Sequence, residues 1–244
     1  MGGIQVKVGG LALALAFWLL PFTSSASGKA SAVNAGSKYR ASQYRELGLS
    51  YQQQERYPLA IATMKKSVEL DPENIVGRVN LGWAQHLARQ DNAAAKSLLQ
   101  AVYRDPVSVP AFNALGIVYL VSGNLVGAVV THAWAAALQP DDEIAYYNLS
   151  LAFERLRLYN SAIATAKRAA TLEPHNPHPL IALAIAHWEH GDRTLAKIAY
   201  ERARNLDSRY SAHTFLPQLK IAGFSQSQIQ MAEQVRSGAC QFCR

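Results

Sequence analysis

Apolar and small residues recur along this chain at a fixed interval of 34 residues, in five successive copies without insertion or deletion. In the first copy, Tyr44, Leu47, Gly48 and Tyr51 fall at i, i+3, i+4 and i+7, the spacing of one face of an amphipathic helix. The four clearest columns are Leu47, Leu81, Leu115, Leu149 and Leu183; Gly48, Gly82, Gly116, Ser150 and Ala184; Ala60, Ala94, Ala128, Ala162 and Ala196; and Pro72, Pro106, Pro140, Pro174 and Ser208. A repeat of this length predicts a linear array of helical pairs.

Each copy predicts two helices joined by a tight turn. The second helix of the first copy brings Ala60, Met64 and Ser67 towards Gly48, where the paired helices approach closely. The copy then ends at Pro72, because proline cannot continue a helix and restricts the residue before it. No single pair can bury its apolar faces alone, so the array is expected to be stabilised by stacking between neighbours.

These residues resemble the tetratricopeptide repeat (TPR) family over about residues 41–208. The resemblance rests on the leucine–glycine pair, the alanine column, the terminal proline and the aromatic residues Tyr51, Tyr119 and Phe153. Gln85 and His187 depart from the aromatic column. The resemblance implies an all-α, right-handed α-solenoid of five TPR helix pairs, with the first helices lining a concave groove.

The end of the fifth unit needs a cap, and residues 209–236 are suited to form it. Pro217 is expected to start a short helix that Gly223 ends. A second helix is expected to begin at Ser225, because Gln228 follows three residues later in a capping-box pattern. The residues expected to cover the end of the fifth unit are Ile229, Ala232 and Val235.

Residues 1–32 lie before the array and have the layout of a secretory signal peptide. Lys7 precedes an apolar run over residues 8–20, Pro21 follows it, and small residues surround Ala30. The alternative is an uncleaved anchor, but spanning a bilayer takes about 20 apolar residues. We therefore expect export to a periplasm, a thylakoid lumen or the outside of the cell, with residues 33–40 as a linker.

Composition agrees with a packed helical protein and narrows the partners. The chain is 50% hydrophobic and 17% charged, with a net charge of +7 that falls by two if Lys7 and Lys29 leave with the leader. The positive charges are scattered, without a dense basic run, so nucleic-acid binding is not predicted. A membrane would be reached only by association or through an uncleaved leader.

The concave groove is the predicted binding site, for an extended peptide or a helix of a partner protein. Amide side chains can bond a peptide backbone while an apolar column buries its side chains. The predicted groove residues are Asn80, Trp83, His86, Asn113, Ile117, Tyr147, Asn148, Leu151, Arg155 and Trp188. The alternative for any one of them is packing between adjacent units.

The third unit is unusually apolar, since residues 109–142 contain no Lys or Arg. Its second helix is apolar nearly all round, which indicates cover on every side. A docking or self-association patch is therefore predicted at Val129, Val130 and Trp134, which makes a homo-oligomer an alternative. The other interpretation is that exposed alanines in this helix simply favour helix formation.

Few residues carry candidate chemistry. Cys240 and Cys243 form a C-x-x-C pair at the C-terminus, where an exported chain would form a local disulfide or a link to a partner. His187 and His190 stand at i, i+3, but no evident carboxylate or cysteine completes a metal site. No nucleophile–base arrangement or phosphate-binding loop is found, so we predict no catalytic residue, cofactor or metal.

These observations together predict a non-enzymatic adaptor that holds a partner peptide or helix in its groove. The resemblance implies a role in assembling an envelope, pilus or thylakoid complex. The alternatives are a structural oligomer built through the third unit and a redox accessory protein that uses the pair in the tail at residues 237–244.

Overall fold

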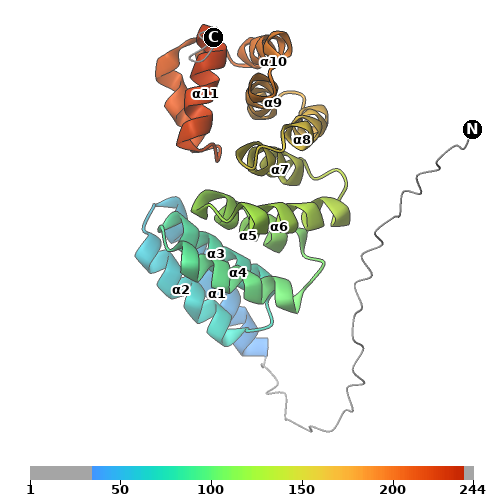
Figure 1. Ribbon diagram of the computed structural model, residues 1–244. Helices are drawn as coiled ribbons and strands as arrows, with labels where there is room; N and C mark the ends of the chain where they lie inside the picture. Colours follow the sequence, from blue (N-terminus) through green and yellow to red (C-terminus); the bar gives the residue numbers. More distant parts are fainter. Residues whose placement is uncertain (1–34, 239–244) are drawn as a thin grey trace, which may run out of the picture. The chain divides into compact units, whose positions relative to one another are not determined.

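The structure is a computed structural model that describes residues 35–238 of the 244-residue chain (Figure 1). The predicted leader and the pair Cys240 and Cys243 lie outside the described residues. The elements in chain order are α1 (Ala35–Gln53), α2 (Tyr57–Leu70), α3 (Ile75–Leu87), α4 (Asp91–Arg104), α5 (Val109–Ser122), α6 (Leu125–Leu138), α7 (Glu143–Arg155), α8 (Tyr159–Leu172), α9 (Pro177–His190), α10 (Arg193–Leu206), the 3-10 turns η1 (Ser208–Ser211) and η2 (His213–Lys220), and α11 (Gln226–Ser237).

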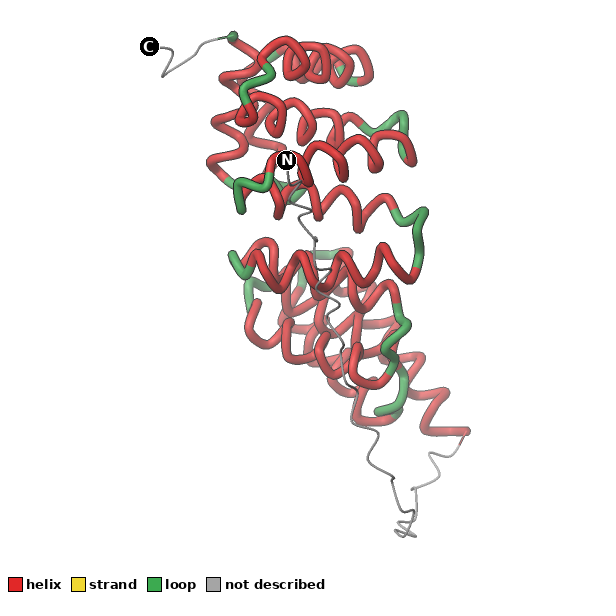
Figure 2. The backbone as a smooth tube through the Cα atoms, turned by 45° about the vertical axis from the view of Figure 1, so that its right-hand side comes forward, coloured by secondary structure: helices red, strands yellow, loops and turns green. Residues whose placement is uncertain are grey.

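Helices α1–α10 form five consecutive pairs, which confirms the predicted α-solenoid. Each helix packs on the next in sequence, and the first helices α1, α3, α5, α7 and α9 also contact one another in order. Figure 2 shows the backbone of these stacked helices and the short loops between them. Residues 35–238 contain no strand, and none of their helices is long and apolar enough to cross a membrane. The first helices therefore form one continuous layer, whose free side we call the inner face.

The array begins earlier than the sequence indicated. Helix α1 starts at Ala35, so residues 35–40 extend the first helix rather than form a linker. Just after this extension, the Ser67 hydroxyl donates to the Ala41 carbonyl at 2.7 Å and ties α1 to α2.

The glycine column marks the close approach of the two helices in a pair. A Cβ at Gly116 would collide with the ring of His132 on α6. His132 is fully buried, and its Nδ1 lies 3.3 Å from Asn113 Oδ1. The third unit thus places a polar ring in a column that Met64 and Leu98 fill in the first two units.

A second regular column, absent from the sequence prediction, forms the turn within each pair. Its five members all have positive φ: Glu55 (58°), Arg89 (62°), Gly123 (86°), Arg157 (60°) and Gly191 (100°). Only glycine adopts this left-handed conformation without a steric cost. The repeat therefore fixes the turn geometry even in the three units where the side chain opposes it.

The C-terminal segment is helical, with one difference from the prediction. Pro217 lies inside η2 rather than starting a helix, while Gly223 has a φ of +86° and ends this region as expected. Ser225 and Gln228 form the predicted capping box at the start of α11.

Candidate functional site

The C-terminal segment does more than close the end of the array. Helix α11 packs on α9 and α10, and the chain between η2 and α11 reaches across to α7. The Tyr147 hydroxyl donates to the Ala222 carbonyl at 2.5 Å, and the Tyr147 ring meets Phe224 edge-on with centroids 6.0 Å apart. The segment therefore lies on the inner face of the fourth and fifth units.

One glutamine fastens α11 to the fourth unit. Gln228 Nε2 donates to the Leu151 carbonyl at 3.2 Å and to Glu154 Oε2 at 2.6 Å. Gln228 is buried, so both bonds are shielded from water. The same side chain also accepts from the Ser225 backbone N–H in the capping box, which couples the start of α11 to its contact with α7.

Burial shifts the acid–base properties of this contact. It raises the pKa of Glu154 to about 7, with a further contribution from Glu189, while the bond from Gln228 and the charge of Arg155 act in the opposite direction. Arg155 Nη1 donates to the Leu120 carbonyl at 2.6 Å, and burial lowers the pKa of its guanidinium. Arg155 thus links α7 to the end of α5.

Three of the predicted groove residues are buried in the fourth and fifth units. Leu151 is 1% exposed, Trp188 is 3% exposed and Asn148 is also buried. The Arg193 guanidinium lies 3.7 Å from the Trp188 ring centroid. These buried side chains are not accessible to an incoming peptide, and the half-buried Tyr147 already bonds the C-terminal segment.

Two further predicted groove residues bond within the array. His86 is buried, with Nδ1 2.7 Å from Asp91 Oδ1 at the start of α4. Asn113 is buried, and its amide donates to Asp142 Oδ2 at 2.5 Å. The polar atoms of both side chains bond other parts of the array. Both residues therefore fit the alternative interpretation, in which they pack within the array and do not bind a partner.

The inner face of the first three units is open. Asn80, Trp83 and Ile117 are half-buried, and Leu49 and Val76 are exposed. Trp83 packs on the core below it, and its ring meets that of His86 at a tilt of 44°, with centroids 5.3 Å apart. This surface combines an apolar column with an accessible amide. The sequence analysis did not predict Val76, although its position seven residues before Trp83 places both on one face of α3.

The predicted patch on the third unit is placed in part. Val130 and Trp134 are exposed on α6, whereas Val129 is half-buried against the core. Val126, one turn before Val130, is exposed in its place. A helix spacing of four residues rather than consecutive positions defines the exposed stripe.

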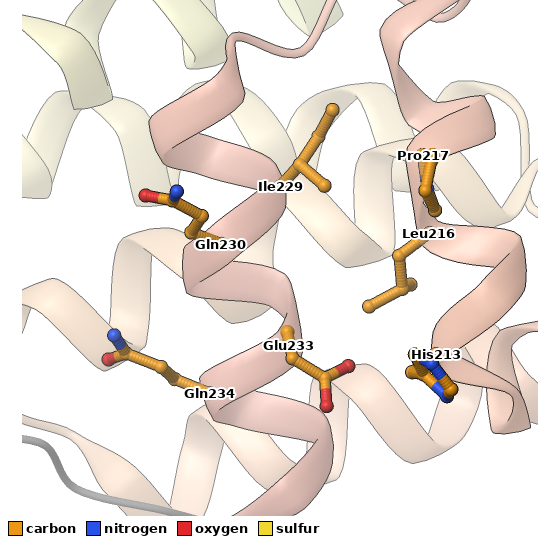
Figure 3. A pocket seen from close by; sticks show the side chains of 7 residues that line it. All are labelled: His213, Leu216, Pro217, Ile229, Gln230, Glu233 and Gln234. Carbon is orange, nitrogen blue, oxygen red and sulfur yellow. The ribbon is translucent and has the colours of Figure 1, made fainter.

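The described residues offer little for metal or substrate chemistry. His187 and His190 both approach Asp192 Oδ2, at 3.4 Å and 2.9 Å, but no group of three or more His, Cys, Asp or Glu within residues 35–238 is arranged to hold a metal. A cavity of about 500 Å³ lies between η2 and α11, floored by Leu216 and Ile229, with the Glu233 carboxylate directed towards His213 (Figure 3). Glu233 is already paired with Arg236 at 2.6 Å.

This arrangement defines the class: a helical-repeat solenoid that presents surfaces for protein binding. The tetratricopeptide repeat family model matches residues 44–74 and 144–176, which are the first and fourth units. Five in-register helix pairs contain those matches, so the chain carries tetratricopeptide repeats.

Several solved structures are similar to this chain in fold. A crystal structure of MamA is 22% identical with a TM-score of 0.62, over 70% of this chain and 94% of that one. MamA from Desulfovibrio magneticus RS-1 is 18% identical with a TM-score of 0.64, over 69% and 96%. TTC0263, a thermophilic TPR protein of Thermus thermophilus, is 19% identical with a TM-score of 0.58, over 78% and 99%. No curated protein matches the chain by sequence.

Proposed function

We propose that the protein is a non-enzymatic adaptor that binds a peptide or helix of a partner protein on the inner face of its first three units. The single observation that supports this is the contrast along one column. Leu151 lies against the chain's own C-terminal segment and Ile185 is also buried, whereas Leu49, Trp83 and Ile117 at the same position of the repeat are accessible. The inner face of the fourth unit thus already binds one polypeptide segment, the C-terminal segment of the same chain.

The accessible side chains of the inner face have different roles in binding the partner. Trp83 is the anchor, because a large aromatic in an apolar column contributes most to such interfaces. Asn80 bonds the partner backbone, since its amide can both donate and accept. Leu49, Val76 and Ile117 supply the apolar contacts on either side. The proposed occupant is an apolar or amphipathic segment.

The proposal includes export and assistance in assembling an envelope, pilus or thylakoid complex. It rests on the layout of residues 1–32 and on the binding character of the repeat family, and not on any catalytic arrangement. The partner is expected in the same compartment as the mature chain.

Affinity capture from the native compartment tests the proposal. The full chain is compared with a variant carrying Trp83→Ala and Asn80→Asp, and with Leu99→Ala as a matched control on the outer side of α4, where Leu99 is exposed. We expect proteins captured by the natural chain and by Leu99→Ala to be lost with the double variant. Equal recovery by all three chains would refute binding at the inner face.

A further inference from the structure

A carboxyl group lies at the point where the C-terminal segment meets the fourth unit. Glu154 Oε2 accepts from Gln228 Nε2 at 2.6 Å, and the same nitrogen also donates to the Leu151 carbonyl at 3.2 Å. Gln228 Oε1 accepts from the Ser225 backbone N–H at 2.9 Å, so both ends of this buried amide are bonded. One carboxyl group on α7 is therefore part of the contact that holds the segment in place.

The acidic residues at this contact are particular to the two units that the segment reaches. The residues at the position of Glu154 in the other units are Gln52, His86, Leu120 and Trp188, and those at the position of Glu189 are Gln53, Leu87, Val121 and Arg155. None of these eight residues is acidic. The repeat fold therefore does not require a carboxyl group at either position.

Glu154 borders a polar cavity of about 390 Å³. The titratable groups that face it there are Arg155 on α7, Arg157 in the next turn, Tyr159 on α8 and Glu189 on α9. The Tyr159 hydroxyl donates to Glu189 Oε2 at 3.2 Å. No ion pair among residues 35–238 includes either carboxyl group. The remaining lining, from α6 and α11, consists of Leu125, Ser227 and Met231.

The C-terminal segment contributes to the burial of Glu154. Burial raises the pKa of this residue to about 7, the bond from Gln228 lowers it, and Glu189 raises it. If Ser227, Gln228 and Met231 moved away, water would reach the carboxyl group and its pKa would move towards the ordinary value of 4.5. The covered state then binds more protons than the open state. Its stability is therefore complete below pH 4.5 and is lost as pH rises to about 7.

Only the start of α11 takes part in this contact. Ala232 and Val235, one and two turns after the contact, are buried in the core that they share with α9 and α10. The contact with α7 is made by residues 221–228, where Phe224 packs edge-on against Tyr147 and favours the covered state. Residues 221–228 can therefore leave α7 while the later turns of α11 stay on the fifth unit.

We propose that ionisation of Glu154 releases residues 221–228 from α7 and opens the inner face of the fourth unit. The opened surface serves the proposed function, on which this inference rests, because Leu151 continues the column of Trp83 and Ile117. In weakly acidic solution a partner segment has three units of inner face, and above pH 7 it gains a fourth. The C-terminal segment is thus a pH-dependent cover over part of the binding surface.

Hydrogen exchange of the full chain at pH 5 and pH 8, corrected for the intrinsic pH dependence of exchange, tests the release. With pKa values of 4.5 and about 7 for Glu154, the balance between the open and covered states shifts by up to about 70-fold between these conditions. We expect the protection of residues 222–231 to fall by at least about tenfold. Glu154→Gln keeps an acceptor for Gln228 and cannot ionise, so it should remove this fall.

Glu233→Gln is the matched control. It is the same substitution on α11 itself, and the Arg236 guanidinium holds the pKa of Glu233 below its ordinary value, so Glu233 is ionised at both pH values. Its removal should leave the fall in protection within about twofold of that in the natural chain. Hydroxyl-radical footprinting then reads access to the surface: oxidation of Leu151, which is 1% exposed, should rise at pH 8 while that of Trp83 stays constant.

Equal protection of residues 222–231 at the two pH values, or the same fall in Glu154→Gln, would overturn the proposal. It would also be overturned if these residues were protected to the same degree as α8 and α10 at each pH, because they would then open only when whole helices unfold. Each outcome is read on the chain alone. The capture experiment with Trp83→Ala and Asn80→Asp decides separately whether the first three units bind a partner.

Discussion

The inner face has an open half, formed by the first three units, and a covered half, formed by the fourth and fifth units. Both halves follow the same 34-residue register, but only the covered half carries the C-terminal segment. Trp83 and Ile117 stand in the same column as Leu151 and Ile185, yet the first two are half-buried and the last two are inaccessible. For Leu151 the difference comes from residues 221–228, which lie beyond the last repeat and bond back to α7. The repeat decides which side chains face inward, and the segment after it decides which of them a partner can reach.

The strongest test of this comparison removes the contact that covers the second half. Phe224 is buried against Tyr147, so Phe224→Ala is expected to destabilise the fourth and fifth units by about 3–5 kcal/mol. Stability in repeat arrays depends mainly on neighbouring units, so the loss should be confined to this half. Native-state hydrogen exchange, read separately for α7–α9 and for α1–α4, measures it.

Ile221→Ala is the matched control for this prediction. Ile221 lies three residues away in the same segment but is 86% exposed. Its truncation is expected to change the free energy of unfolding by less than about 0.5 kcal/mol. An equal loss of protection in α1–α4 and in α7–α9 with Phe224→Ala would show that the two halves are not energetically distinct.

The two halves are also expected to respond to pH in opposite directions. Burial lowers the pKa of His132, in the third unit, to about 3 from an ordinary value of 6.5. Below pH 6.5 the unfolded chain binds a proton that the folded chain excludes, so stability falls by up to about 1.4 kcal/mol per pH unit towards pH 3. His132→Leu, which restores the apolar character of Leu98 in this column, should remove that fall.

Glu154 behaves in the reverse manner in the covered half. Its folded pKa of about 7 lies above its ordinary value of 4.5. Between these values the folded state binds more protons, so stability falls as pH rises through this window. Glu154→Gln keeps an acceptor for Gln228 and should raise the stability of α7–α9 at pH 7. Exchange measured from pH 5 to pH 7.5 should show the two regions changing in opposite senses; parallel changes would contradict this assignment.

The sequence predicted the fold because its 34-residue columns are built on local physics. Leucine, glycine and alanine repeat where helices must pack. The spacing of Ser225 and Gln228 was sufficient to predict the capping box at the start of α11. The site was harder. Tyr147 and Leu151 were predicted to be open to a partner, but they contact a segment that folds back over 70 or more residues of chain, as the Gln228–Leu151 bond shows. No local pattern encodes such a contact.

Polar pairing set a second limit on prediction. Asn113 was predicted to bond a peptide backbone because the sequence shows its amide. The sequence does not show that this amide donates to Asp142, 29 residues away. The exposed stripe on α6 was found in outline because charge is absent from the whole third unit. Which valine faces solvent depends on the phase of the helix, and only the structure shows that phase.

The smallest expected effect on stability comes from substitutions in the turn within a helix pair. Arg89, in the open half, holds a φ of 62° at a position where Gly123 and Gly191 serve in other units. Arg89→Gly relieves the left-handed strain but adds freedom to the unfolded chain, and the balance should stabilise the second unit by about 0.5–1 kcal/mol. Gly123→Ala should cost a similar amount or more. Because coupling between units is local, the gain from Arg89→Gly should appear as slower exchange in α3 and α4 while α7–α9 stay unchanged. A gain spread over both halves would mean that the array unfolds as one cooperative body, and the distinction between open and covered halves would then concern access alone and not stability.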